Sequence, residues 1–413
     1  MRASHEPFVI EPDEALSRIL EALADVAPLP EERVPLGEAL GRVLAQDVLA
    51  PWALPPFDSS QMDGYALCAA DARRAGARLR VSFEVFAGSR PPPPLERGTC
   101  CRVFTGAPIP AGADSVEMQE EVARRGGVAH FRRPAEPGRF VRKKGSDLEQ
   151  GSVALHRGSL VEPGAIGAAA ALGRTELAVH RRPRVGLIAT GDEIVALDLR
   201  PEAGQLVDSN SHALAAACRE AGAIPVRLPI ARDEPGALLS AIAACEGLDA
   251  IVSTGGVSVG KKDFMRKALL ASGARLGFWR VAMRPGKPIA FGRRGRTAVF
   301  GLPGNPASAL VTFELFVRPA LRAMAGLSVP GRVILPARLA AAVEKPAGLT
   351  HYLRARSWLE GGELVVEPLR RQVSGDLSSV VGFEALVIVP SGVTRVRRGG
   401  RLNAILVTQP GTR

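Results

Sequence analysis

The sequence predicts a multidomain α/β protein organised around a central parallel sheet. Three observations support this prediction. A chain of 413 residues is too long for one ordinary domain. Residues 183–325 alternate strand-like and helical patterns, as parallel sheets do. The flanking segments 67–140 and 330–413 are instead rich in short strand patterns, separated by glycine and proline turns.

Composition restricts the class of protein and of partner. A hydrophobic content of 46% with 23% charged residues is ordinary for a globular protein. The net charge of +11 favours anionic partners, but it does not separate phosphates and oxyanions from nucleic acid or a membrane surface. Five cysteines without a CxxC pair indicate reduced thiols, and no apolar run could span a bilayer. We therefore expect a cytoplasmic protein with no targeting or membrane segment.

The first 140 residues predict a helix, a loop and a β-rich region. Residues 13–26 have one apolar stripe and predict a helix, and residues 34–48 predict a short helix followed by a strand. The loop at 55–66 carries Asp63-Gly64, which is either the corner of a tight turn or part of a functional site. The strands expected in the β-rich region are 79–86, 100–104, 115–122 and 128–132.

A basic stretch at 139–147 follows the β-rich region. Arg142 and two lysines precede Gly145, and Asp147 follows it. The stretch is either a solvated basic turn or a clamp for phosphate or another oxyanion. Alanine-rich residues 163–172 then predict a buried helix.

The central α/β region has two acidic or polar turns in its first half. The strand at 185–189 ends in Thr190-Gly191-Asp192-Glu193. The two carboxylates of this turn suit a bridging Mg²⁺ if a phosphate lies near. The alternative is an ordinary solvated turn. Asp208 or Ser209 is expected to cap a helix that extends to Ala221. The elements expected next are a strand at 224–230, a helix from Asp233 to Cys245 and a strand at 249–253.

Two glycine-rich turns follow in the second half. Residues 254–260, with Gly255, Gly256 and Ser258, resemble a phosphate loop but match neither the Walker A nor the GxGxxG pattern. Asp263 is either a helix cap or a metal ligand. A second anion site is expected at 302–308, where Asn305 caps a helix. This second turn also contains Pro303, and nearby a Pro-Gly turn is flanked by Arg284 and Lys287. Strands are expected at 276–283 and 298–301. Ser374 lies in a polar loop of the C-terminal β region.

The ordered combination of motifs is more specific than any single one. The chain contains, in order, FDSSQMDGYA, TGAPIP, MQEEV, TGDEI, DSN, STGGVSVGKKDF, RPGKP and GLPGNPASA. This series resembles the molybdopterin molybdenumtransferase family, the MoeA type that also forms the C-terminal part of gephyrin. The resemblance extends from about residue 10 to the C-terminus and is weaker after residue 330.

The resemblance implies an elongated homodimer of four-domain subunits. It implies a central Rossmann-like, molybdopterin-binding α/β domain, an inserted β domain, a discontinuous helical/β domain and a C-terminal β barrel. The expected boundaries are 1–52 with 143–180 for domain I, 53–142 for domain II, 181–329 for domain III and 330–413 for domain IV.

The resemblance also implies an activity: insertion of molybdate into adenylylated molybdopterin, with Mg²⁺-dependent release of AMP. A molybdopterin adenylyltransferase would be the upstream partner, and neither nucleic acid nor membrane would be bound. The implied catalytic residues are Asp63, Glu193, Asp233 and Asp263, of which the last three would also hold Mg²⁺, and Asp63 would reach the site from the partner subunit. The implied substrate-binding residues are Thr105, Arg142, Asp147, Asp192, Gly255, Gly256, Ser258, Arg284, Lys287, Pro303, Asn305 and Ser374.

The chain departs from the family pattern at several positions. Lys261 replaces a common acid beside the expected metal site, and Asp376 adds a negative charge near Ser374. These departures keep open a second hypothesis, a non-catalytic scaffold of the same fold that binds the pterin or a partner protein. A third hypothesis, a nucleic-acid binder, depends on net charge alone because no nucleic-acid module accompanies it.

Overall fold

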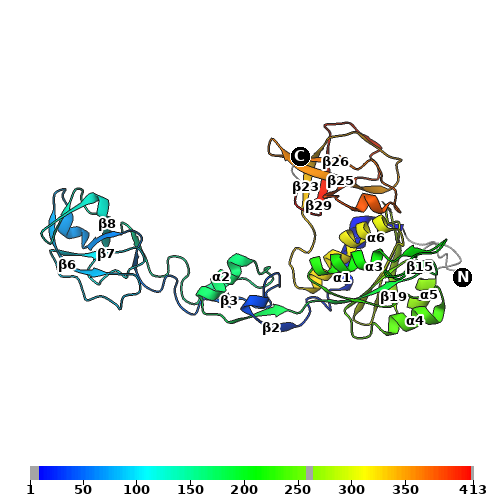
Figure 1. Cartoon of the computed structure of the whole chain (residues 1–413), viewed down its shortest axis with the longest axis horizontal. Helices are drawn as coiled ribbons and strands as arrows, with labels where there is room; N and C mark the ends of the chain where they lie inside the picture. The colour runs from blue at the N-terminus through cyan, green and yellow to red at the C-terminus, as the bar shows by residue number, and fades with distance from the viewer. Residues whose placement is uncertain (1–8, 257–263, 411–413) are drawn as a thin grey trace. The chain divides into compact units, whose positions relative to one another are not determined.

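The chain forms two compact units in the computed structural model, which describes residues 9–256 and 264–410 (Figure 1). The large unit comprises residues 1–45, 158–162 and 176–413. The small unit comprises residues 46–157 and 163–175. No helix within the described ranges is long and apolar enough to cross a bilayer.

A seven-stranded sheet forms the centre of the large unit. Its order is β1-β19-β21-β22-β18-β14-β17, and the strands are β1 (Val9–Ile10), β14 (Arg184–Ala189), β17 (Ile224–Arg227), β18 (Ala250–Thr254), β19 (Arg275–Val281), β21 (Pro288–Arg294) and β22 (Thr297–Leu302). Strands β17, β14, β18 and β22 are parallel, as predicted. The expectation of a wholly parallel sheet is wrong at β21, which is antiparallel to both neighbours. Only two residues join β21 to β22, and a connection that short permits a hairpin but no parallel crossover.

Helices cover both faces of this sheet. They are α1 (Pro12–Ala22), α3 (Asn210–Glu220), α4 (Pro235–Ala243), α5 (Phe264–Ala271), α6 (Pro306–Thr312), the π-helix η4 (Phe313–Val317) and α7 (Arg318–Met324). Val185 and Leu187 of β14 pack with α1, α3 and the helices from α6 to α7, whereas Ile188 packs with α4 and α5 (Figure 1). This alternation is what a strand covered on both faces requires.

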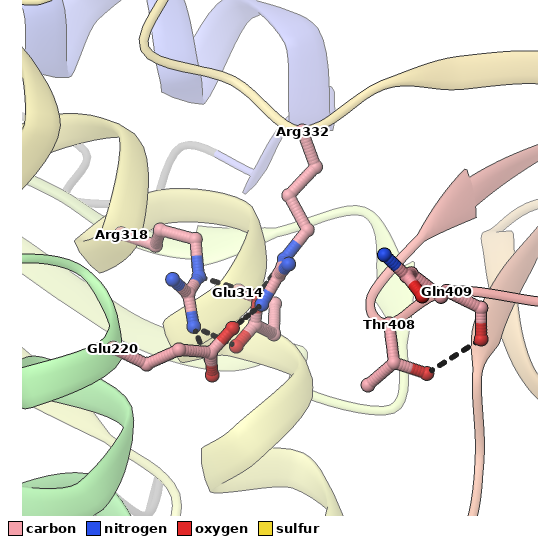
Figure 2. A network of polar contacts seen from close by, with 6 residues as sticks. All are labelled: Glu220, Glu314, Arg318, Arg332, Thr408 and Gln409. Carbon is pink, nitrogen blue, oxygen red and sulfur yellow. Dashed lines mark hydrogen bonds and ion pairs between the residues drawn. The ribbon is translucent and has the colours of Figure 1, made fainter. Parts of the chain in front are cut away.

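An ion-pair network ties the end of α3 to the helices that follow α6 and to the chain leading into the C-terminal region (Figure 2). Arg318 is only 1% exposed, and it donates to Glu314 at 2.7 Å and to Glu220 at 3.0 Å. Arg332 donates to the same two carboxylates, at 2.5 Å and 2.9 Å. Two guanidinium groups therefore share two carboxylates, and this arrangement compensates the buried charges.

A closed five-stranded barrel forms the C-terminal part of the large unit, as the resemblance implies. Its strands pair in the cycle β25-β26-β23-β29-β27, and β20 adds to β25. The bounds are β20 (Met283–Arg284), β23 (Ile334–Leu339), β25 (Thr350–Glu360), β26 (Glu363–Pro368), β27 (Ala385–Val389) and β29 (Arg401–Leu406). The large unit also contains the pairs β2 (Glu31–Pro35) with β13 (Glu176–His180), β15 (Ile194–Val195) with β16 (Leu206–Val207), and β24 (Val343–Glu344) with β28 (Arg395–Val396), and the 3-10 turns η1 (Leu36–Glu38) and η5 (Leu377–Val380).

The small unit is built on a six-stranded sheet, in agreement with the β-rich prediction. Its order is β8-β5-β7-β6-β10-β9, with β5 (Gly64–Leu67), β6 (Arg78–Val85), β7 (Thr99–Val103), β8 (Ser115–Met118), β9 (Val122–Arg125) and β10 (Val128–Phe131). The remaining elements are β3 (Val48–Leu49) with β12 (Val153–Leu155), β4 (Ser59–Ser60) with β11 (Val141–Arg142), the helix α2 (Pro163–Ala171), and the 3-10 turns η2 (Ala69–Ala72) and η3 (Gln119–Glu121).

Two local predictions are wrong. The short helix expected within 34–48 is only the 3-10 turn η1, because residues 31–35 pair with β13 instead. The single strand expected at 115–122 is divided into β8 and β9 by η3. In both places tertiary pairing overrides the local pattern.

Candidate functional site

Three strands of the central sheet end at the same edge. Ala189 of β14 aligns with Thr254 of β18, which aligns with Leu302 of β22. The first residues beyond the strands continue the pairing: Thr190 N donates to Thr254 O at 3.0 Å, and Gly255 N donates to Leu302 O at 3.2 Å. The turns after these strands therefore lie together, at the edge where parallel sheets bind ligands.

Gly255 allows two of these turns to approach closely. Its φ is +88°, and a Cβ at this position would lie 2.7 Å from the carbonyl oxygen of Thr190. A larger residue would push the first turn away and would strain its own backbone. Gly256 has a φ of +66°, so both residues of the predicted phosphate-binding turn adopt the left-handed conformation that glycine favours.

Three carboxylates lie on the turns beside this edge. Asp192 Oδ1 accepts a hydrogen bond from Asp233 N at 3.2 Å, and a bridge between Thr190 and Ala231 fixes the two segments together. The carboxylate of Glu193 lies over Gly191, where an added Cβ would be 2.7 Å from Oε2. The fold thus brings together two acidic segments that are 40 residues apart.

A cavity of about 680 Å³ opens at this edge. Its lining includes Glu193, Gly255, Gly256, Pro303 and Asn305. Two further residues shape it. Asn210 donates to Gly304 O at 2.7 Å, which fastens the start of α3 to the turn after β22. Asp208 accepts from Ser211 N at 3.0 Å, so it acts as a helix cap.

A second cavity, of about 890 Å³, continues from the first because both are lined by Pro288, Pro303 and Asn305. Its lining also includes Arg284, Lys287 and Ser374. Asn305 Nδ2 donates to Ser374 Oγ at 3.1 Å, and Ala307 N donates to Ser374 O at 3.1 Å. The polar loop of the C-terminal barrel is therefore attached to the start of α6.

His351 is a titratable group in the second cavity that the sequence did not single out. It is 8% exposed, and its ring makes no hydrogen bond within residues 9–256 and 264–410. Burial and the charges of Lys345 and Arg284 lower the pKa of His351 to about 4. Lys345 Nζ is itself occupied, since it donates to the carbonyl oxygens of Pro346, Leu349 and Ser391. His351 is therefore a neutral donor or acceptor among cations.

The remaining predicted site residues belong to the small unit and form two pairs there. Asp63 Oδ1 accepts from the backbone N and the hydroxyl of Thr105, both at 2.8 Å. These two hydrogen bonds lower the pKa of Asp63 and favour its ionised form. Arg142 is paired with Asp147, and it lies opposite Ser59 in the pairing of β11 with β4.

Comparison with known proteins identifies the family. Three family models match consecutive parts of the chain: the MoeA N-terminal region (domain I and II) at 10–173, the probable molybdopterin binding domain at 186–323 and the MoeA C-terminal region (domain IV) at 336–407. Molybdopterin molybdenumtransferase 2 of Mycobacterium tuberculosis is 39% identical over 383 residues, which is 89% of this chain and 93% of the relative. The chain belongs to the molybdopterin molybdenumtransferase family.

Further relatives agree with this assignment. The molybdopterin molybdenumtransferase of Bacillus subtilis is 34% identical over 92% of this chain and 90% of its own length. The crystal structure of the molybdopterin biosynthesis moeA protein from Pyrococcus horikoshii OT3 matches with a TM-score of 0.84 and 30% identity, over 97% of this chain and 100% of that one. The fold described above is therefore that of the molybdopterin molybdenumtransferases.

The expected Mg²⁺ of a molybdopterin molybdenumtransferase is compatible with the carboxylates at the sheet edge. Asp192 and Asp233 are joined by a hydrogen bond, and Glu193 lines the adjoining cavity. Across the described part of the chain no three His, Cys, Asp or Glu side chains gather as a metal site. Because Mg²⁺ is usually held by one or two carboxylates together with substrate phosphates and water, this partial set fits an ion shared with the substrate. Ser258, Asp263 and Lys261 lie outside the described residues.

Sequence reasoning missed Asn210 and His351 for different reasons. Asn210 lay inside a predicted cap, Asp208-Ser209-Asn210, and its polar amide was a usable signal. His351 had no such signal because it lies in an ordinary barrel strand. Only the parallel pairing of β20 with β25, which places it opposite Arg284, brings it to the cavity.

Proposed function

We propose that this protein inserts molybdate into adenylylated molybdopterin and releases AMP with the help of Mg²⁺. The protein is a transferase of molybdenum cofactor biosynthesis, as its family implies. The observation that supports the finer proposal is the pair of continuous cavities. One is lined by glycine-rich turns and a carboxylate, and the other by Arg284, Lys287 and Ser374. Such a pair suits two anionic substrates, one whose phosphates occupy the first cavity and a separate oxyanion in the second.

The glycine-rich turns would bind the phosphates of the substrate. Gly255 and Gly256 expose backbone at the edge of the sheet, and Asn305 stands between the two cavities. Free amides in turns of this kind bind anions without a side-chain charge. Asp192 completes this substrate set from the neighbouring turn.

The second cavity would hold molybdate. Arg284 and Lys287 supply positive charge, and the Ser374 hydroxyl and the Asn305 amide supply hydrogen bonds. Pro303 closes the wall that both cavities share. A tetrahedral dianion placed here would lie beside the pterin end of a substrate whose phosphates occupy the first cavity.

The carboxylates would serve the opening of the phosphoanhydride. Glu193 and Asp233, with Asp263, would hold Mg²⁺, which when bound neutralises phosphate charge. In our proposal a water oxygen attacks the phosphorus on the molybdopterin side, the bond from that phosphorus to the bridging oxygen breaks, and AMP leaves with the bridging oxygen while molybdopterin keeps its phosphate. Glu193 is the group placed to accept the proton of that water, because its carboxylate lines the cavity.

The residues of the small unit would act from the partner subunit of a homodimer. Asp63 is held ionised by Thr105, and the pair of Arg142 and Asp147 lies exposed on the same unit. We propose that these four residues close the site from the partner. We also propose that a molybdopterin adenylyltransferase supplies the substrate in the cytoplasm.

The non-catalytic scaffold is a second candidate, favoured by one sequence observation. Lys261 stands where an acid is common in the family, and it reverses a charge next to Asp263. Such a scaffold would keep the cavities and bind the pterin without turnover.

Measurement of AMP release separates the two candidates. Wild type is compared with Asp63→Ala, Glu193→Ala and the control Glu202→Ala, an exposed acid outside both cavities. The transferase predicts release that needs molybdate and Mg²⁺ and falls at least about a hundredfold in the first two variants only. A folded wild type that binds the pterin and releases no AMP would instead establish the scaffold, and Lys261→Glu would be the first reversion.

A further inference from the structure

Arginines predominate among the charged side chains that line a third cavity of the large unit. Its volume is about 310 Å³, and it shares no lining residue with the two cavities of the candidate site. Arg182, Arg219 and Arg322 line it together with His180 and a single acid, Glu220. The cavity lies where the helices α3 and α7 end.

The one acid of this cavity is already neutralised. Glu220 pairs with Arg318 at 3.0 Å and with Arg332 at 2.9 Å in the network of Figure 2. Burial raises the pKa of Glu220, but the two guanidinium groups outweigh it and leave that pKa below its usual value. Because Glu314 completes the network, its four charges cancel one another.

The other three arginines of the cavity make no close ion pair within the described residues. The side chains of Arg182, Arg219 and Arg322 form neither a hydrogen bond nor an ion pair with any residue that the structure describes. The Nε of Arg322 is buried and has no hydrogen-bond partner among the described residues. Burial and the charges of Arg318 and Arg332 lower the pKa of Arg322, and the charges of Glu220 and Glu314 offset part of this.

The helix ends cannot account for this charge. Each helix C-terminus carries roughly half a negative charge. The ends of α3 and α7 therefore offset about one of the three positive charges, and roughly two remain. Arg42 does not add to the excess, because it is paired with Glu32 and donates to the carbonyl oxygen of His180 at 2.9 Å.

His180 is oriented to take part in binding. Its Nδ1 lies 2.7 Å from the carbonyl oxygen of Leu29, which can only accept, so Nδ1 carries the proton. Nε2 of this neutral ring is an acceptor, so it can donate to a phosphate oxygen only when the ring takes up a second proton. Gly326 packs against the same ring, since a Cβ at this position would collide with it, so the ring is fixed in place.

We propose that this cavity binds a small phosphate-bearing molecule as a dianion, at a site separate from the candidate active site. Guanidinium groups recognise phosphate through paired N–H donors, and a dianion matches the excess of about two positive charges. The ligand is inorganic phosphate or a small phosphate monoester. Binding here stabilises the junction of α3 and α7, because the ligand neutralises the charge beside the ion-pair network.

Calorimetric titration with inorganic phosphate tests the proposal on the full chain. All proteins carry Lys287→Gln, which weakens anion binding at the candidate active site. We expect saturable binding that weakens about ten- to a hundredfold in Arg322→Gln and in Arg219→Gln, because each removes a charge-assisted hydrogen bond. The control Arg398→Gln changes an exposed arginine that lines none of the three cavities, and it should bind like the parent.

Thermal unfolding provides a second readout. Phosphate should raise the midpoint of the parent more than chloride at equal ionic strength, and Arg322→Gln should lose this difference while remaining folded. AMP release by Arg322→Gln with Lys287 intact should equal that of wild type, which separates this site from the proposed activity. Phosphate affinity that is unchanged in both cavity variants, or no saturable binding in the Lys287→Gln parent, would overturn the proposal.

Discussion

The side-chain amide of Asn305 donates a hydrogen bond to the hydroxyl of Ser374, 3.1 Å away. Asn305 begins the helix after β22, and Ser374 lies in a loop of the C-terminal barrel. Asn305 lines both cavities of the candidate site, whereas Ser374 lines only the second. A change on the barrel side can therefore affect phosphate binding on the sheet side.

Removal of the Ser374 hydroxyl should uncouple the two cavities. Ser374→Ala loses a hydrogen bond worth about 1 kcal/mol, so molybdate should bind about fivefold more weakly. The control Ser378→Ala removes a hydroxyl of the same loop that bonds Asp376 and lines neither cavity. The molybdate concentration for half-maximal AMP release measures the effect. Equal shifts in both variants would mean that general loosening of the loop is responsible.

Replacement of Arg354 should disturb the position of the polar loop around Val373 and Ser374 while changing the stability of the protein little. This side chain is fully buried, and its Nη2 donates to Val373 O at 3.2 Å. Its Nε and Nη1 have no hydrogen-bond partner in the part of the chain that the structure describes. Burial lowers the pKa of Arg354, and the charge of Asp376 offsets part of this. Arg354→Met keeps the aliphatic part of the side chain and removes the buried charge. The free energy of unfolding in urea should therefore change by no more than about 1 kcal/mol. Molybdate-dependent AMP release should fall. Arg356→Met, at the next exposed position of β25, should alter neither.

Stability should depend on pH through His351. Its pKa is about 4 in the folded protein, below the ordinary 6.5, so between these values the unfolded chain binds more protons. The contribution of the neutral His351 to the free energy of unfolding is therefore complete above about pH 6.5 and is lost as the pH falls toward 4. Screening by solvent that enters the open cavity reduces the expected loss to about 1–2 kcal/mol. Urea unfolding across this range measures it.

His351→Gln should remove that part of the pH dependence. His156→Gln changes an exposed histidine of the small unit and should leave the profile as in wild type. If the His351 variant retains the full pH dependence of stability, other groups cause it.

Molybdate in the cavity would favour the protonated ring of His351, so molybdate should bind more tightly to wild type at pH 6 than at pH 8.

Gly64 should tolerate no side chain. A Cβ at this position would collide with the carbonyl oxygen of Glu117 on the paired strand β8. Gly64→Ala should therefore destabilise the small unit by about 2 kcal/mol or more, through a shift of backbone next to Asp63. Gly167→Ala has open space inside α2 and should instead stabilise by up to about 1 kcal/mol. The midpoints of thermal unfolding distinguish the two variants, and an equal change of the midpoint in both would contradict the steric argument.

Local pattern predicts most elements of the central sheet and the turns after its parallel strands, but it does not predict the strand β21. Apolar runs such as 185–189 and 250–254 are long enough to mark buried strands, and the glycines after them mark tight turns. Because parallel strands end at one edge of a sheet, the sequence predicts that the turns with Gly255 and Asn305 lie close together. Asp63 was ambiguous, since an Asp-Gly pair is also an ordinary turn corner. Its hydrogen bonds come from Thr105, 42 residues away.

The sequence by itself determined the strand and helix alternation, the β-rich flanks and the family, because these depend on short-range periodicity and on motif order. Only the tertiary structure decided that β21 runs antiparallel, that His351 faces Arg284, and that Arg182, Arg219 and Arg322 share one cavity. Arg284 and His351 are 67 positions apart in the chain, and Arg182 and Arg322 are 140 positions apart. These relationships follow from which surfaces pack together, and burial and pairing free energies summed over the whole unit decide that packing.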